Sequence, residues 1–245
     1  MRNISVYEKD YLMDEFEPHM VKYRRKQVLQ LLSQYPHKRI LEVGCGMEPL
    51  FEHIKNYEEY SLIEPSVLFY DNALDKAQNL KNVFFYQGFL EDTVKNLQNE
   101  AKFDFIVASS LLHEVENPMR FLNSVKLVMN KDTILHINVP NSNSLHSQLG
   151  VRMGLSGNIF EKSDLAKKMQ RHSTFDTNQL IKFVRRYGFE VINTGGYFLK
   201  PFTYHQLNSM LNQEIITEKI LDALYELGKE QPLQAAEIYI NVKIK

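Results

Sequence analysis

The sequence predicts an α/β protein with an open, doubly wound sheet. Short apolar runs, suited to buried strands, alternate with amphipathic stretches of helical period. Such alternation implies right-handed crossovers between parallel strands, with helices on both faces of the sheet. Glycines follow the first apolar run directly, at the strand end where open sheets of this kind bind ligands.

Bulk properties favour one sizeable globular domain. The chain has 245 residues, of which 44% are hydrophobic and 24% charged. A net charge of −1 gives no electrostatic case for nucleic acid or anionic membranes. Cys45 is the single cysteine, which fits a reducing compartment, and the charged start of the chain does not resemble a secretory signal. No apolar run approaches ~18 residues, so we expect a cytoplasmic protein without a membrane span.

The first part of the chain is expected to supply five strands. They are 38–44, 59–66, 82–90, 103–112 and 132–141. An amphipathic helix over 20–35 precedes them. Further helices are expected between them at 49–57, opened by Pro49, at 69–80, and at 117–130, capped by Asn117.

A polar, loop-rich stretch over 141–170 interrupts the alternation. A helix over 177–189, ended by Gly188, and a strand over about 189–194 then resume it. Two helices, at about 203–212 and 214–227, lead to a last stretch, "AEIYINVKI", whose alternation indicates a strand with one wet face, paired antiparallel. The expected layout is a single domain over 1–245. It has an N-terminal segment (1–35), a core (36–140 and 177–245) and an insertion (141–176).

The stretch "LEVGCGMEPL" (41–50) indicates a ligand site. Gly44 and Gly46 allow a sharp turn and let a ligand approach bare backbone. Glu64 ends the second expected strand, 20 residues after Gly44, where a carboxylate can accept two hydrogen bonds from a ribose diol. A glycine turn after one strand, followed by a carboxylate at the end of the next strand, predicts a cofactor that contains a nucleoside.

The flanking residues discriminate between nucleosides. A dinucleotide fingerprint needs a third glycine where this chain has Pro49, and it places a pyrophosphate on helix N–H groups that proline lacks. Glu42 and Glu48 would also repel phosphates. S-adenosylmethionine fits better, because it has a ribose and no phosphate, and its sulfonium and ammonium groups tolerate the acid at 42. A nicotinamide-dependent oxidoreductase remains the alternative.

Four motifs in order resemble those of class I S-adenosylmethionine-dependent methyltransferases. They are "LEVGCGMEPL", "LIEPS", "FDFIVASSLLHEVENP" and "LHINVPNSNSLHSQLG", the last two being similar to the group around ubiquinone-biosynthesis O-methyltransferases. The resemblance covers about 38–195 and implies a Rossmann-like, mostly parallel sheet of seven strands with an N-terminal helical lid. It implies cofactor contacts at Glu42, Gly44, Cys45, Gly46, Glu64, Pro65, Ser66, Phe89, Leu90, Ser109, Ser110 and Leu111. Phe89 replaces an aspartate that binds adenine in many relatives, so stacking, the Leu90 backbone or Glu91 are the alternatives.

Several side chains are candidates for the acceptor side. His113, after the fourth strand, is the first candidate for a general base, or else packs against the cofactor; Glu114 contacts substrate or begins the next helix. Arg171 and His172 suit a phosphate or carboxylate, or belong to a solvated helix end. The full prediction is His113 and His172 as catalytic residues and Tyr11, His19, Tyr23, Glu114, Asn141, His146 and Arg171 as substrate contacts. Acids beside Cys45 raise its thiol pKa, which argues against a nucleophile.

The expected activity is methyl transfer to a small molecule, by direct displacement and without a metal. Oxygen is favoured over nitrogen as the acceptor atom. The loops "VPNSNSLH" and "RHSTFD" resemble enzymes of bacterial surface-polysaccharide pathways, which favours a sugar, a nucleotide-linked sugar or another phosphorylated metabolite. A methyltransferase-like partner subunit without activity is the non-enzyme alternative. We expect a monomer or homodimer that binds neither nucleic acid nor membrane.

Overall fold

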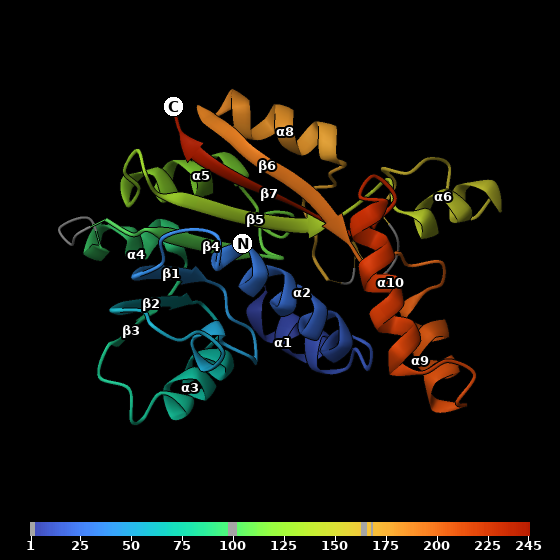
Figure 1. Cartoon of the computed structure of the whole chain (residues 1–245), viewed down its shortest axis with the longest axis horizontal. Coiled ribbons are helices and arrows are strands. Elements are labelled where there is room, and N and C mark those ends of the chain that lie inside the picture. The colour runs from blue at the N-terminus through green and yellow to red at the C-terminus, as the bar shows by residue number, and fades with distance from the viewer. Residues whose placement is uncertain (1–2, 98–101, 163–165, 168) are drawn as a thin grey trace.

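The computed structural model describes residues 3–97, 102–162, 166–167 and 169–245. Its centre is one sheet of seven strands in the order β3-β2-β1-β4-β5-β7-β6 (Figure 1). The strands are β1 (Arg39–Val43), β2 (Glu59–Glu64), β3 (Val83–Gln87), β4 (Phe105–Ser109), β5 (Ile134–Pro140), β6 (Phe189–Tyr197) and β7 (Glu237–Ile244). Neighbours among the first five are parallel, and β7 pairs antiparallel with both β5 and β6. The predicted sheet is therefore confirmed.

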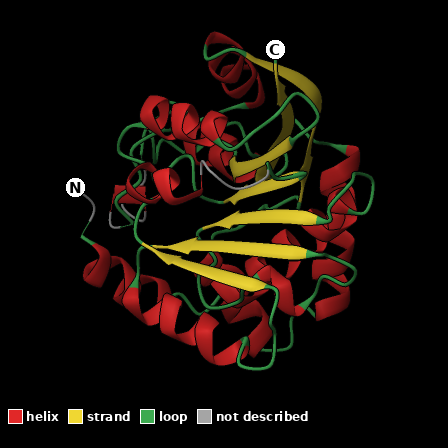
Figure 2. Ribbon diagram, turned by 90° about the vertical axis from the view of Figure 1, so that its left-hand side faces the viewer, coloured by secondary structure: helices red, strands yellow, loops and turns green. Residues whose placement is uncertain are grey.

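Helices cover both faces of the sheet, as the turned view in Figure 2 shows. In chain order they are α1 (Ile4–Leu12), α2 (Glu17–Leu32), α3 (Val67–Lys76), α4 (Leu90–Leu97), α5 (Pro118–Leu127), α6 (Leu145–Arg152), α8 (Thr177–Arg186), α9 (Tyr204–Asn212) and α10 (Glu218–Glu230). Apolar side chains of α4, α5 and α8 fill one face, while α2 and α3 fill the other. A smaller cluster joins α2 to α9 and α10. Helices pack on both faces because the strands between them are apolar on both sides.

Local signals explain several helix ends. Asn117 caps α5 with a bond from the Arg120 N–H to its side chain (3.0 Å), as predicted. Asp176 and Gln179 form a reciprocal capping box on α8.

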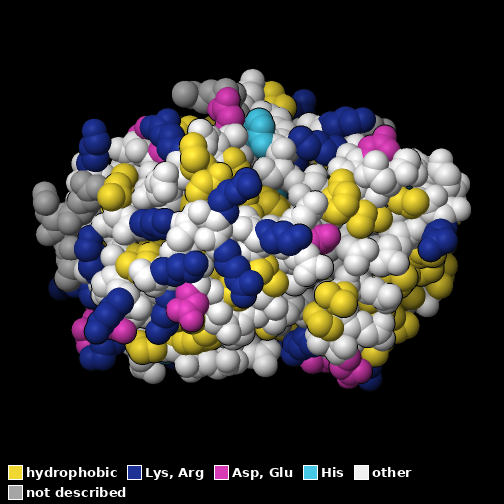
Figure 3. All heavy atoms as spheres, turned by 90° about the horizontal axis from the view of Figure 1, so that it is seen from above, with side chains coloured by type: hydrophobic (Ala, Val, Ile, Leu, Met, Phe, Trp, Pro, Cys, Tyr) yellow, Lys and Arg dark blue, Asp and Glu magenta, His cyan; other side chains and the backbone are white. Residues whose placement is uncertain are grey.

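Figure 3 looks down on the face that carries α8, where many Lys and Arg side chains lie among apolar ones.

One prediction about an element is wrong, and one helix was not predicted. The helix expected over 49–57 is a single 3-10 turn, η1 (Leu50–Glu52), because Pro49 is extended and Asn56 has a positive φ of 68°. The loop-rich stretch over 141–170 also contains a helix that was not predicted, α6, which Ser144 caps by accepting a bond from the Ser147 N–H. The described residues include no helix long and apolar enough to cross a membrane.

Candidate active site

A pocket of about 250 Å³ opens at the carboxyl ends of β1, β2 and β4. The strand order reverses between β1 and β4, which is where open α/β sheets bind ligands. Every residue that the sequence predicted to bind a cofactor lines this pocket. The glycine turn after β1, the acid that ends β2, the loop after β3 and the loop after β4 thus meet in one place.

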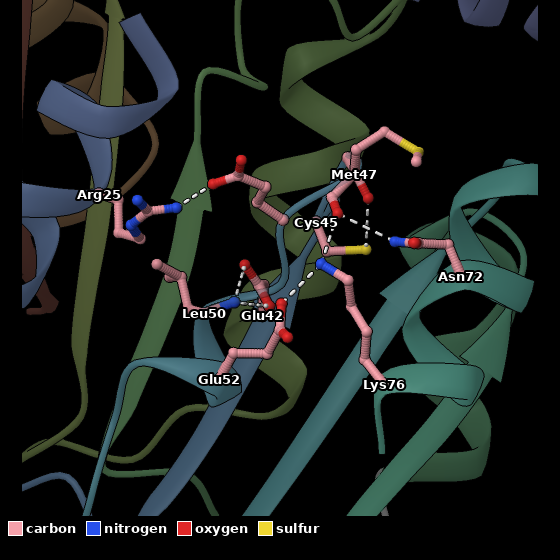
Figure 4. A network of polar contacts seen from close by, with 10 residues as sticks. Arg25, Glu42, Cys45, Met47, Leu50, Glu52, Asn72 and Lys76 are labelled. Carbon is pink, nitrogen blue, oxygen red and sulfur yellow. Dashed lines mark hydrogen bonds and ion pairs between the residues drawn. The ribbon is translucent and has the colours of Figure 1, made fainter. Parts of the chain in front are cut away.

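The glycine turn needs its glycines for backbone reasons. Gly44 and Gly46 have φ angles of 77° and 57°, in the left-handed region that side chains rarely adopt. A Cβ on Gly46 would also lie 3.0 Å from the Tyr11 hydroxyl oxygen. The turn is tied to α3, because Asn72 and Lys76 both donate to the Met47 carbonyl (2.9 and 3.1 Å; Figure 4).

Glu64 is fixed at the pocket wall by backbone donors. Its two carboxylate oxygens accept from the N–H groups of Cys45 (3.0 Å) and Ser66 (2.9 Å). Burial raises the pKa of Glu64, and these backbone bonds oppose that rise. A carboxylate has lone pairs for about four hydrogen bonds, so acceptor capacity remains for a ligand.

Glu42 is a second buried acid in the same wall, only 3% exposed. It accepts hydrogen bonds from the Tyr60 hydroxyl (2.7 Å) and from the Leu50 N–H (3.2 Å; Figure 4). Burial raises the pKa of Glu42 to about 8 despite these bonds. A cation bound nearby would restore its charge, so the wall is suited to a positively charged ligand.

Cys45 lines the same turn as a thiol. Burial, then the charges of Glu64 and Glu42, raise its pKa well above the ordinary value. A reactive thiolate is therefore disfavoured, in agreement with the sequence argument.

The N-terminal helices form the outer wall. Ile4, Tyr7 and Tyr11 of α1 line the pocket, and Asn3, ahead of α1, exchanges two hydrogen bonds with the Gln170 side chain (2.9 and 3.0 Å). Glu8 of α1 accepts a short hydrogen bond from Ser66. From α2, the pocket receives Glu17, Val21, Arg24, Arg25 and Val28.

Three of the predicted substrate contacts reach the pocket. Tyr11, Glu114 and Arg171 line it. His113 lies behind Glu114, 2% exposed, with its Nε2 3.6 Å from the Glu114 carboxylate. His172 is exposed and outside the lining, although its N–H donates to the His113 carbonyl (2.8 Å).

The other predicted substrate contacts lie outside the lining. Tyr23 is buried and donates to Asp222 (3.0 Å), and His19 pairs with Glu218 (3.0 Å). Asn141 donates to the carbonyls of Leu233 and Ala235 (3.1 and 2.8 Å). His146 lies in the first turn of α6, where burial lowers its pKa to about 4.

Sequence reasoning missed several lining residues, among them Arg25, Phe69, Asn117 and Arg120. The sequence of α2 did contain a pattern that indicates a pocket-facing side. Its five lining residues recur at helical spacing along one face, from Glu17 to Val28, and three charged residues on such a face are unusual for pure packing. The described residues contain no group of three His, Cys, Asp or Glu side chains that could hold a metal ion.

Comparisons with known proteins agree with this geometry. The model of the family described as "Methyltransferase domain" matches residues 17–194. A polyketide synthase–nonribosomal peptide synthetase of Aspergillus flavipes is 26% identical over 128 residues, which is 46% of this chain and 3% of that protein. The chain thus aligns with a very small part of that synthetase.

Two solved structures share the fold over nearly the whole chain. One, from Thermotoga maritima, is described as an S-adenosylmethionine-dependent methyltransferase and possible histamine N-methyltransferase. It has 18% identity and a TM-score of 0.61, with 99% of each chain covered. The other is a plantazolicin methyltransferase in complex with a triazolic desmethylplantazolicin analogue and S-adenosylhomocysteine. It has 18% identity and a TM-score of 0.57, covering 99% of this chain and 94% of that one.

Proposed function

Because this chain belongs to the S-adenosylmethionine-dependent methyltransferase family, we propose that its pocket methylates a small molecule, at oxygen rather than nitrogen. The observation that carries the proposal is the meeting of Glu42, Glu64 and the glycine turn in one pocket. Family membership also removes the nicotinamide alternative considered above.

The residues present fit the cofactor. Glu64 has acceptor capacity for the ribose hydroxyls, and Glu42 supplies a buried carboxyl that a sulfonium or ammonium would ionise. Phe89 and Leu90 line the pocket after β3, next to Glu91 and Asp92, and form the proposed adenine end. When bound, S-adenosylmethionine supplies an electrophilic methyl group.

Glu114 is the proposed proton acceptor. It is 5% exposed, lines the pocket after β4, and has the His113 imidazole 3.6 Å away. A hydroxyl acceptor must lose its proton as it attacks, and a carboxylate with an imidazole behind it can take that proton. His113 is then a positioning residue, since its side chain does not line the pocket.

The acceptor class rests on the loops "VPNSNSLH" and "RHSTFD". Their likeness to polysaccharide-pathway enzymes supports a sugar, a nucleotide-linked sugar or a phosphorylated metabolite. A non-catalytic partner subunit is the second candidate, and turnover decides between the two.

The test measures release of S-adenosylhomocysteine with hydroxyl and amine acceptors drawn from sugars, sugar nucleotides and phosphorylated metabolites. For a hydroxyl acceptor, Glu114→Gln should lower kcat by about 10²–10⁴-fold with little change in KM for S-adenosylmethionine. Glu190→Gln, on the exposed side of β6, is the matched control. Cofactor binding without turnover on any acceptor would contradict the proposal and favour the partner subunit.

A further inference from the structure

Arg24 and Arg171 line the end of the pocket that is formed by α2 and the loop before α8, and a third basic side chain, Lys200, lies outside the lining but near enough to Arg171 for their charges to interact. Arg24 is neutralised by two acids, since its guanidinium lies 2.9 Å from Glu17 and 3.5 Å from Glu237. Arg171 and Lys200 have no such partner. In the part of the chain that the structure describes, neither side chain makes an ion pair or a hydrogen bond.

Arg171 faces the pocket from a well-fixed loop. It lines the pocket beside Met169, and its Nε is buried without a hydrogen-bond partner. Its own N–H donates to the Ala166 carbonyl (2.9 Å). The adjacent Gln170 bonds to Asn3, and His172 bonds through its backbone to His113. The backbone around Arg171 is thus fixed, while the Nε–H of its half-buried guanidinium has no partner among the described residues.

Lys200 is buried outside the pocket lining. It follows β6, is 8% exposed, and places its Nζ 3.8 Å from the ring centroid of Tyr204. Burial, then the charge of Arg171, lower the pKa of Lys200 to about 8. The acids that act on it from further away are otherwise engaged: Glu17 and Glu237 bind Arg24, and Asp14 accepts the Phe16 N–H (3.1 Å).

Burying a cation without a bonded partner is costly, and two neighbouring cations raise that cost. An oxyanion between them would relieve it and would give the Arg171 guanidinium the planar partner that it suits. We propose that Arg171 and Lys200 hold a carboxylate or phosphate group of the methyl acceptor. This inference rests on the proposed function.

The topology separates this subsite from the adenine end. The Arg171 loop is bonded to the segment that follows β4, whereas Phe89 and Leu90 follow β3, and β2 and β1 lie between β3 and β4. The anionic group would therefore lie on the acceptor side of the pocket. The cofactor's own carboxylate is the competing occupant.

The test titrates the full chain with sodium phosphate or sodium acetate against sodium chloride at equal ionic strength. Each titration is run with and without saturating S-adenosylhomocysteine, and Tm is followed. Wild type should show a saturable rise in Tm with one of the two oxyanions and none with chloride. Arg171→Gln and Lys200→Met should each weaken the apparent affinity by about tenfold or more, while Arg171→Lys should retain part of it.

Matched controls come from outside the pocket. Arg186→Gln on α8 and Lys22→Met, whose ammonium pairs with Glu218 (2.7 Å), should respond to oxyanions as wild type does. Lys200→Met should fold at least as stably as wild type in chloride, because it removes a buried charge that has no bonded partner. Equal oxyanion responses in Arg171→Gln and wild type would overturn the inference.

Calorimetric titration with S-adenosylhomocysteine separates the two occupants. Its affinity should be the same in Arg171→Gln and wild type. A parallel loss of S-adenosylhomocysteine binding would mean that the pair binds the cofactor's carboxylate, which also overturns the inference. Wild type that binds no S-adenosylhomocysteine would contradict the proposed function instead, and the oxyanion titration without nucleoside would still decide the role of Arg171 and Lys200.

Discussion

At the scale of single residues, the site depends on two buried acids with different partners. Backbone N–H groups hold Glu64, whereas a tyrosine hydroxyl and one N–H hold Glu42. Glu42 lies in β1, next to its last residue, and Glu64 ends β2, so their positions change little without local unfolding. Their different partners give different expected responses to substitution and to pH.

Glu64→Ala should weaken S-adenosylhomocysteine binding by about 10–100-fold. The change removes an acceptor for the ribose and leaves the N–H groups of Cys45 and Ser66 without their partner; hydrogen bonds to charged groups contribute about 1.5–3 kcal/mol. Calorimetric titration measures the effect. Glu52→Ala, which loses an ion pair to Lys76 beside the same turn, should bind normally. Equal affinities for both variants would remove Glu64 from the site.

Glu42 should make cofactor selectivity depend on pH. Its pKa of about 8 means that it is mostly neutral at pH 7 and ionises as pH rises. The sulfonium of S-adenosylmethionine favours the carboxylate, and S-adenosylhomocysteine lacks that charge. Affinity for the first relative to the second should therefore rise between pH 6 and 9, by about tenfold for each unit by which the sulfonium lowers the pKa. Glu42→Gln should abolish the trend, and a pH-independent ratio in wild type would contradict it.

The same group affects stability in the opposite direction. The folded-state pKa of Glu42 lies above its ordinary value of 4.5 because burial disfavours its charge. The unfolded chain therefore releases this proton at lower pH than the folded chain. The contribution of Glu42 to folding is fully present below about pH 4.5 and is lost as pH rises through about 8.

At the scale of elements, α1 differs from the other helices around the pocket. It contributes no buried residue, yet three of its side chains line the pocket and Tyr11 lies against Gly46. Its aromatic residues contact Phe69, with centroid distances of 6.3 Å from Tyr7 and 5.2 Å from Tyr11. These contacts fit the predicted N-terminal lid, which remains a proposal.

Deletion of residues 1–13 should separate ligand binding from folding. Because α1 buries little of itself, the Tm of unliganded protein should fall by only a few degrees, while S-adenosylhomocysteine affinity should fall by about tenfold or more. Fluorimetry and calorimetry measure the two effects. Asp176→Ala, which removes the α8 capping box at a cost of about 1 kcal/mol, is the reverse control: it lowers Tm and leaves affinity intact. Unchanged affinity after the deletion would exclude a lid.

Local sequence signals predicted elements well where the signal and the packing agreed, as at Asn117 and the glycine turn. They failed at 49–57, where Pro49 is extended and the positive φ of Asn56 ends the segment after one 3-10 turn. Contacts between distant elements, which no local pattern reveals, separate the acceptor-side candidates. Tyr23, His19 and Asn141 are bound by Asp222, Glu218 and backbone carbonyls of the last third of the chain. Their residue types suited a site, but tertiary pairing had already used them.

At the scale of the whole molecule, ligand binding should raise the stability of the fold. Ligand at ~100 times its dissociation constant adds about 2.7 kcal/mol, which for a domain of this size is roughly 5–11 °C in Tm. S-adenosylmethionine and S-adenosylhomocysteine should produce this shift in a fluorimetric titration, and NAD and NADP should not. A shift with NAD alone would refute the assignment of the pocket.

The order of strands in the sheet means that the sheet can be completed only after the last strand has been made. The strand β7 comes last in the sequence but lies between β5 and β6, so two inner edges stay unpaired until residues 237–244 arrive. Such distant pairing is slow, and open edges invite association with other chains. During synthesis at about 5–20 residues per second, β1 to β5 can assemble seconds before their missing neighbour emerges. Nascent chains halted before residue 237 should therefore bind chaperones and aggregate, whereas chains that extend past 244 should be protected.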